Sequence, residues 1–178
     1  SPYATIGEFL GYPRPTTIAE LAQVGLPARV GVVVCAVTSD GYLAFHTRRR
    51  NLEAPDGFHF VGEGMIPTDV IGDRLSPDAT AFRGLSEEVD IHSSNVDLSL
   101  TGIFIDQTRL QLVFTYVAEL EIDADQYALN GDLAVDSFES TGFEFYELRS
   151  TNKGLIERLL AKEAPDSGAS NHARVALL

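Results

Sequence analysis

The segment Ser76-Pro77-Asp78-Ala79-Thr80-Ala81-Phe82-Arg83-Gly84-Leu85-Ser86-Glu87-Glu88-Val89-Asp90-Ile91 decides the fold. Its first three residues predict a helix start, because Ser favours the N-cap, Pro the first helical position, and Asp the positive end of the helix dipole. Apolar residues then recur at four-residue steps, at Ala81, Leu85 and Val89, so one face of the helix can be buried. We therefore predict a helix over residues 77 to about 89, with its charged residues on other faces.

The segments on both sides of this helix have patterns typical of strands. The β-branched run Val30 to Val37 is followed by the turn Ser39-Asp40-Gly41 and by the alternating stretch Tyr42 to His46, which predicts a β-hairpin. Loops are expected at 67–75 and at 123–140, the second with a short helix. The other predicted elements are strands at 58–61, 98–105, 110–120 and 143–148 and a helix at 152–161.

The composition is that of an ordinary globular protein. The chain has 178 residues, 44% hydrophobic and 22% charged, which suits one folded domain. We expect an N-terminal arm at 1–29, the domain at 30–163 and a C-terminal linker or tail at 164–178. The formal net charge of -13 argues against binding to a nucleic acid polymer, but a small phosphorylated ligand needs only a local metal ion or a few arginines.

Cysteine content and hydropathy bear on where the protein works. The single cysteine, Cys35, lies in an apolar run, so we expect it to pack in the core and the chain to have no intramolecular disulfide. No stretch approaches the ~20 apolar residues of a membrane-spanning helix. These features predict a cytoplasmic protein without a membrane partner. The start at Ser1 without Met and the end at Leu178 favour a segment of a longer protein.

The order of these elements, together with residues 83–91, resembles the Nudix hydrolase superfamily. That family's motif is G-x5-E-x7-R-E-U-x-E-E-x-G-U, with U an aliphatic residue. Five positions of the second half match, namely Arg83, Leu85, Glu87, Glu88 and Ile91. The resemblance implies a Nudix-like α/β/α sandwich with a mixed central β-sheet.

The same motif is degenerate at three places. Gly84 stands where the first glutamate of the second half belongs, and Asp90 replaces the glycine. Counting back from Arg83 puts Leu75 at the position of the isolated glutamate. The glycine end of the motif fits Gly62 or Gly64, with about five extra residues in the loop. Since positions 84 and 88 share one helix face, an intact motif would aim two carboxylates at one ion.

The resemblance also implies roles for particular residues. Glu87 and Glu88 would bind Mg²⁺ at a weakened site, and Arg83 pairs with Glu87 at ion-pair spacing. We expect catalytic roles for Arg83, Glu87, Glu88 and Glu139. Replacement acids could come from Glu63, Glu119, Glu121, Asp136 or Glu139. Ligand contacts are expected from Arg48, Arg49, Arg50, Phe58, Gly62, Glu63 and Gly64. For His46 and His59 we favour structural roles.

Two functions follow from this pattern. The first is a Nudix-like domain that binds a nucleoside-diphosphate-type ligand with weak or absent hydrolysis, because the motif lacks key glutamates. The alternative is an active Mg²⁺-dependent hydrolase of a nucleoside diphosphate linked to another group, using a replacement acid from a later loop. Homodimerisation and fusion to other domains are both compatible with the sequence.

Overall fold

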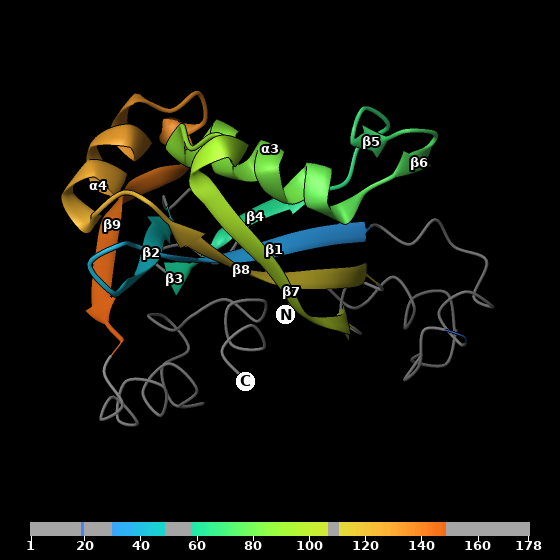
Figure 1. Ribbon diagram of the computed structural model, residues 1–178, viewed down its shortest axis with the longest axis horizontal. Coiled ribbons are helices and arrows are strands. Elements are labelled where there is room, and N and C mark those ends of the chain that lie inside the picture. Colours follow the sequence, from blue (N-terminus) through green and yellow to red (C-terminus); the bar gives the residue numbers. More distant parts are fainter. Residues whose placement is uncertain (1–18, 20–29, 49–57, 107–110, 149–178) are drawn as a thin grey trace, which may run out of the picture.

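The computed structural model describes residue 19 and residues 30–48, 58–106 and 111–148 (Figure 1). The predicted arm, the helix expected at 152–161 and the tail at 164–178 lie outside the described residues, so the domain boundaries stay predictions. The described elements contain the whole of the segment that carries the family resemblance.

One mixed sheet organises the described part of the chain. Its strands are β1 (Val30–Val37), β2 (Tyr42–Arg48), β3 (Phe58–His59), β4 (Val61–Gly64), β7 (Val96–Asp106), β8 (Gln111–Leu120) and β9 (Ser140–Glu147). Strand β1 runs parallel to β8 along its whole length and antiparallel to β4 on its other side. Strand β7 pairs with β8, while β3 and β9 pair with β2, all antiparallel. The predicted hairpin at 30–46 is confirmed as β1 and β2.

The two faces of β1 pack against different cores, as the alternation of side chains in a strand requires. Val32 and Val34 face the helix α3 (Pro77–Val89), which buries Leu85 against them. Val33 and Cys35 face the opposite core. Cys35 is buried in this core, which confirms that it is a packing residue, and burial raises the pKa of its thiol to about 12.

Helix α3 and the second helix, α4 (Ala124–Leu133), lie together over one side of the sheet in Figure 1. The short helices η1 (Ser93–Asn95) and η2 (Ser137–Glu139) connect strands and helices at the edges. The predicted α/β class, with a mixed central sheet and flanking helices, is confirmed. Among the described residues, no helix is long and apolar enough to cross a membrane.

The predicted start and end of α3 are confirmed. Ser76 is the N-cap and accepts a hydrogen bond from Ala79 N, with Pro77 at the first helical position. At the other end Asp90 adopts a left-handed conformation, with φ of 49°, and its N–H donates to the carbonyls of Leu85 and Ser86. The family motif has glycine at this place, so the substitution keeps the helix end but puts a side chain where glycine is favoured.

The expectation of a loop at 67–75 is wrong. Residues Val70–Ile71 (β5) and Arg74–Leu75 (β6) pair as a small antiparallel hairpin, closed by Gly72 with φ of 66°. Short strands of two residues lack the alternation that predicts a strand, and their tight turn requires the positive φ that Gly72 supplies. The hairpin lengthens the connection between β4 and α3.

The strain at Asp90 gives a test of the helix end. Asp90→Gly is expected to raise the free energy of unfolding by roughly 0.5 to 1 kcal/mol, because glycine adopts positive φ without the steric cost of a Cβ. Urea unfolding measures the change. The matched control is Asp125→Gly in the first turn of α4, where the same substitution in ordinary helical geometry should lower stability. A loss of stability in Asp90→Gly would contradict the assignment.

Candidate functional site

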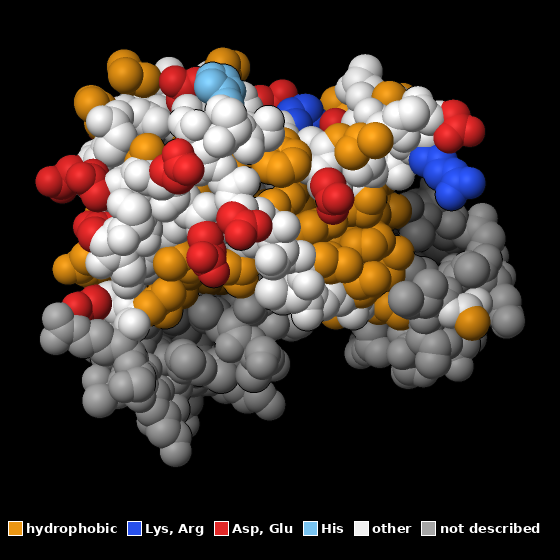
Figure 2. Space-filling view, in the orientation of Figure 1, with side chains coloured by type: hydrophobic (Ala, Val, Ile, Leu, Met, Phe, Trp, Pro, Cys, Tyr) orange, Lys and Arg blue, Asp and Glu red, His pale blue; other side chains and the backbone are white. Residues whose placement is uncertain are grey.

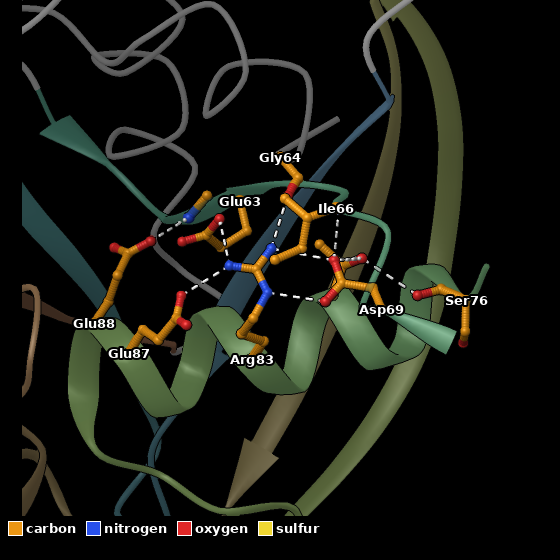
Figure 3. Close-up of polar contacts among 10 residues, drawn as sticks. Glu63, Gly64, Ile66, Asp69, Ser76, Arg83, Glu87 and Glu88 are labelled. Carbon is orange, nitrogen blue, oxygen red and sulfur yellow. Dashed lines mark hydrogen bonds and ion pairs between the residues drawn. The ribbon is translucent and has the colours of Figure 1, made fainter. Parts of the chain in front are cut away.

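The guanidinium of Arg83 is the centre of a polar network above α3 (Figure 3). Its Nε donates to Asp69 Oδ1 at 2.9 Å, and its Nη2 donates to Asp69 Oδ2 at 3.1 Å and to the carbonyl of Gly64 at 2.7 Å. Its Nη1 lies 2.8 Å from Glu87 Oε2 and 3.0 Å from Glu63 Oε2. The hydrogen bonds to Asp69 above all raise the pKa of Arg83, so the guanidinium remains charged.

Asp69 is the principal partner of Arg83, and the sequence reasoning missed it. The carboxylate is buried and also accepts hydrogen bonds from Ile66 N and Thr80 Oγ1, both at 2.9 Å. Hydrogen bonding from Arg83 lowers the pKa of Asp69 and so favours the ionised carboxylate. Leu75, where the isolated acid of the motif was expected, is instead 55% exposed in the β5–β6 hairpin. Because this hairpin lies between Asp69 and α3, counting back from Arg83 ends at Leu75 and does not reach Asp69.

Gly84 leaves space that another acidic side chain fills. A Cβ built at Gly84 would lie 2.8 Å from Glu63 Cγ and 3.1 Å from Val61 Cγ1, closer than ordinary contacts between carbon atoms. The side chain of Glu63 therefore crosses from β4 over the helix at the one residue without a side chain. Glu63 thus places a strand carboxylate beside the face of the helix on which Gly84 lies.

Three carboxylates from separate elements meet beside Arg83. An oxygen of Glu63 on β4, one of Glu87 on α3 and one of Asp136 before η2 all lie within 4.8 Å of one another. The backbone fixes part of this arrangement, since Asp136 N donates to the carbonyl of Glu87 at 2.9 Å. Burial raises the pKa of Glu63, although Arg83 opposes the shift. Clustered carboxylate oxygens suit a hard divalent cation such as Mg²⁺ or Mn²⁺.

Glu88 points to a different environment from Glu87. It is only 7% exposed, accepts a hydrogen bond from Gly62 N at 2.9 Å, and its Oε2 lies 3.4 Å from His46 Nδ1. One carboxylate oxygen of Glu88 and one ring nitrogen each of His46 and His59 lie within 4.8 Å of one another. The two adjacent glutamates that were predicted to hold one ion thus belong to two different polar groups in the structure.

The structure places the other candidate residues as follows. Gly62 and Gly64 lie in β4 and contact the site through their backbones, Gly62 through its N–H and Gly64 through its carbonyl. Glu119 and Glu121 line a separate pocket together with Ser94 and Asp97. Arg49 and Arg50, and the side chains of Arg48, Phe58 and Glu139, lie outside the described residues, so their roles stay predictions.

Asp69→Ala tests the structural role of the Arg83 network. Removing one partner from a buried ion pair should lower the free energy of unfolding at pH 7 by about 2 to 4 kcal/mol. Since the folded-state pKa of Asp69 is lowered, its contribution is full above the unfolded pKa of about 4 and is lost as pH falls through the folded pKa. The stability difference from wild type, measured by urea unfolding, should therefore shrink below about pH 4. Asp73→Asn, at a 97% exposed side chain of the neighbouring hairpin, is the control and should change nothing measurable.

Known proteins are similar to this chain in fold. No protein-family model matches the chain, and no curated protein matches its sequence. In solved structures, the chain is similar to DR0079 from Deinococcus radiodurans, at 17% identity and a TM-score of 0.56, over 85% of this chain and 84% of that one. It is also similar to a MutT/Nudix family protein from Listeria innocua, at 12% identity and a TM-score of 0.53, over 85% and 90% of the two chains. A Nudix-family hydrolase from Clostridium perfringens matches at 14% identity and a TM-score of 0.49, over 85% and 97%. The chain has a Nudix-like fold.

Proposed function

We propose that the chain binds a divalent cation, Mg²⁺ above all, at Glu63, Glu87 and Asp136 and uses it to bind and hydrolyse a small nucleoside-diphosphate-type ligand. The observation that carries this proposal is the position of Glu63 over Gly84. This position supports an acidic site in which β4 supplies a carboxylate beside position 84, where the helix has none. We therefore favour the active Mg²⁺-dependent hydrolase, which was the alternative prediction from the sequence, and we assign its replacement acid to Glu63 on β4.

The donor set fits the proposed cation. All three side chains offer carboxylate oxygens, which Mg²⁺ and Mn²⁺ prefer over the nitrogen and sulfur ligands of softer ions. Three carboxylates, those of Glu63, Asp69 and Glu87, pair with one guanidinium, so the site retains negative charge that a divalent cation can neutralise. A bound cation would screen the charge of a diphosphate and polarise it toward attack by water.

The residues of the chain would divide the remaining tasks. Arg83 positions Glu63 and Glu87 through its Nη1, while Asp69 holds the guanidinium in place from the other side. Burial raises the pKa of Glu63, whereas a bound cation would favour its ionised form, so we assign Glu63 the role of a ligand to the cation. We assign ligand contacts to the arginines at 48–50 as part of the proposal.

The charge of the molecule favours a small ligand over a polymer. The net charge is -13, and acidic side chains are scattered over the face drawn in Figure 2. Such a surface repels the extended phosphate backbone of a nucleic acid. A single diphosphate needs only the local positive charge of the cation and of nearby arginines.

Binding without turnover is the second candidate, and one observation favours it. Glu63 and Glu87 both form ion pairs with the same Nη1 of Arg83. A cation must compete with the guanidinium for these oxygens, which weakens its binding. In that case the domain would still bind a diphosphate ligand but hydrolyse it slowly or not at all.

A panel of nucleoside diphosphate derivatives, assayed with and without Mg²⁺ or Mn²⁺, tests the proposal. We expect metal-dependent release of nucleoside monophosphate, and a fall of about 10²-fold or more in Glu63→Ala and Glu87→Gln. Glu121→Gln, at an acid outside the cluster, is the control and should retain full activity. Absence of turnover at high protein concentration, with ligand binding retained in calorimetry, would replace hydrolysis with the binding function.

A pair of substitutions at Glu63 and Gly84 makes this test specific. Gly84→Glu alone should lower stability and activity, because its Cβ collides with the side chain of Glu63. The double variant Glu63→Ala with Gly84→Glu removes the collision and restores a carboxylate from the helix, so it should recover activity relative to Glu63→Ala. Equal activity of Glu63→Ala and wild type would contradict the assigned role of Glu63.

A further inference from the structure

His46, His59 and Glu88 form a buried group that is separate from the carboxylate cluster of Glu63, Glu87 and Asp136. His46 is 1% exposed, His59 4% and Glu88 7%. One ring nitrogen from each histidine and one oxygen from Glu88 all lie within 4.8 Å of one another. Two imidazoles and a carboxylate therefore converge in the interior of the protein.

The fold brings these three residues together from separate elements. His46 on β2 and His59 on β3 are cross-strand partners, and their ring centroids lie 5.1 Å apart. Glu88 reaches them from the last turn of α3. We propose that His46, His59 and Glu88 form a second metal site, which binds a first-row transition ion such as Zn²⁺ rather than Mg²⁺.

The outer atom of each proposed ligand has a partner that orients it. His59 Nδ1 lies 2.7 Å from the carbonyl of Phe60, which only accepts hydrogen bonds, so Nδ1 carries the proton and Nε2 presents a lone pair. His46 Nε2 lies 2.8 Å from the hydroxyl of Tyr127, which leaves Nδ1 facing Glu88. Glu88 Oε1 accepts from Gly62 N at 2.9 Å, which leaves Oε2 facing His46.

This pattern is what a metal site requires beyond its ligands. A histidine that binds a metal through one nitrogen commonly donates its other N–H to a carbonyl or another oxygen, which fixes the ring and the tautomer. The hydroxyl oxygen of Tyr127, 2.8 Å from His46 Nε2, is the oxygen that can accept from the outer nitrogen of His46. Ser140 Oγ, 3.4 Å from His46 Nδ1, adds a hydroxyl at the edge of the group.

The spacing and the donor types select the kind of ion. Ligand bonds of 2.0 to 2.1 Å in a tetrahedral site put neighbouring ligand atoms roughly 3.4 Å apart. The separation of His46 Nδ1 from Glu88 Oε2 is 3.4 Å. Imidazole nitrogens suit Zn²⁺, Co²⁺ or Fe²⁺, whereas Mg²⁺ prefers oxygen ligands and keeps several waters. The group is therefore chemically distinct from the carboxylate cluster of Glu63, Glu87 and Asp136.

Titration of the metal-free full chain with Co²⁺ tests this site, because tetrahedral Co²⁺ absorbs visible light. We expect saturation at one equivalent of tightly bound Co²⁺, displacement by Zn²⁺ and no displacement by excess Mg²⁺. His59→Asn should weaken the affinity by at least about 10-fold. His92→Asn, at an exposed histidine, is the matched control and should bind as wild type does.

Two further variants keep the test decisive. If His59→Asn fails to fold, Glu88→Gln replaces it, since the amide keeps the side-chain volume and an acceptor for Gly62 N. Glu63→Gln with Glu87→Gln should leave the Co²⁺ spectrum unchanged, which separates this site from the proposed hydrolytic site. The absence of stoichiometric Co²⁺ absorption in the wild type would overturn the proposal, as would unchanged binding in a folded His59 or Glu88 variant.

Discussion

The ion pairs of Arg83 hold together the parts of the chain that form the site. Its guanidinium contacts the carbonyl of Gly64 and the side chain of Glu63 on β4, Asp69 before the β5–β6 hairpin, and Glu87 one turn along its own helix. A planar group with several fixed donors can satisfy these acceptors at once, which an ammonium group could not do in the same geometry. At the cluster, this one side chain therefore joins β4, Asp69 and α3, in addition to the apolar packing of Leu85 against the sheet.

The packing of Glu63 over Gly84 places a carboxylate from β4 beside a helix position that has no side chain. A helix residue with a side chain would displace Glu63 from its present position, whereas Gly84 leaves room for the Cβ and Cγ of Glu63. The two positions are therefore complementary. The chemistry of such a site depends on where carboxylate oxygens lie, and the backbone segment that supplies them is of secondary importance.

Local features of the sequence predicted the elements well. The capping signal at Ser76 and the four-residue apolar spacing gave α3 with its bounds, and β-branched alternation gave β1 and β2. The hairpin at 70–75 escaped prediction because two-residue strands carry almost no periodic signal. That error hid Asp69, since motif spacing assumes a fixed loop length. The turn signal Ile71-Gly72-Asp73 could have predicted this hairpin, and with it a longer connection between β4 and α3.

The site was less predictable, because its contacts join residues that are far apart in the chain. Glu63 and Asp136 were among several candidate acids, and only the packing of β4 and the turn before η2 against α3 selects them. The histidines at 46 and 59 were given structural roles, since no sequence spacing links them to Glu88. Their convergence depends on the register of β2 with β3 and on the direction in which the end of α3 faces the sheet.

The central claim is that Glu63, Glu87 and Asp136 form one cation site despite the loss of the acid at position 84. The most direct measurement is a crystal structure of the full chain soaked with Mn²⁺, with the ion located by its anomalous scattering. The account predicts one Mn²⁺ bound by oxygens of these three residues, with Glu63 still lying over Gly84. A cluster that stays unoccupied at saturating Mn²⁺, or a Glu63 side chain turned away from the helix, would contradict it, whether or not an ion also binds at His46, His59 and Glu88.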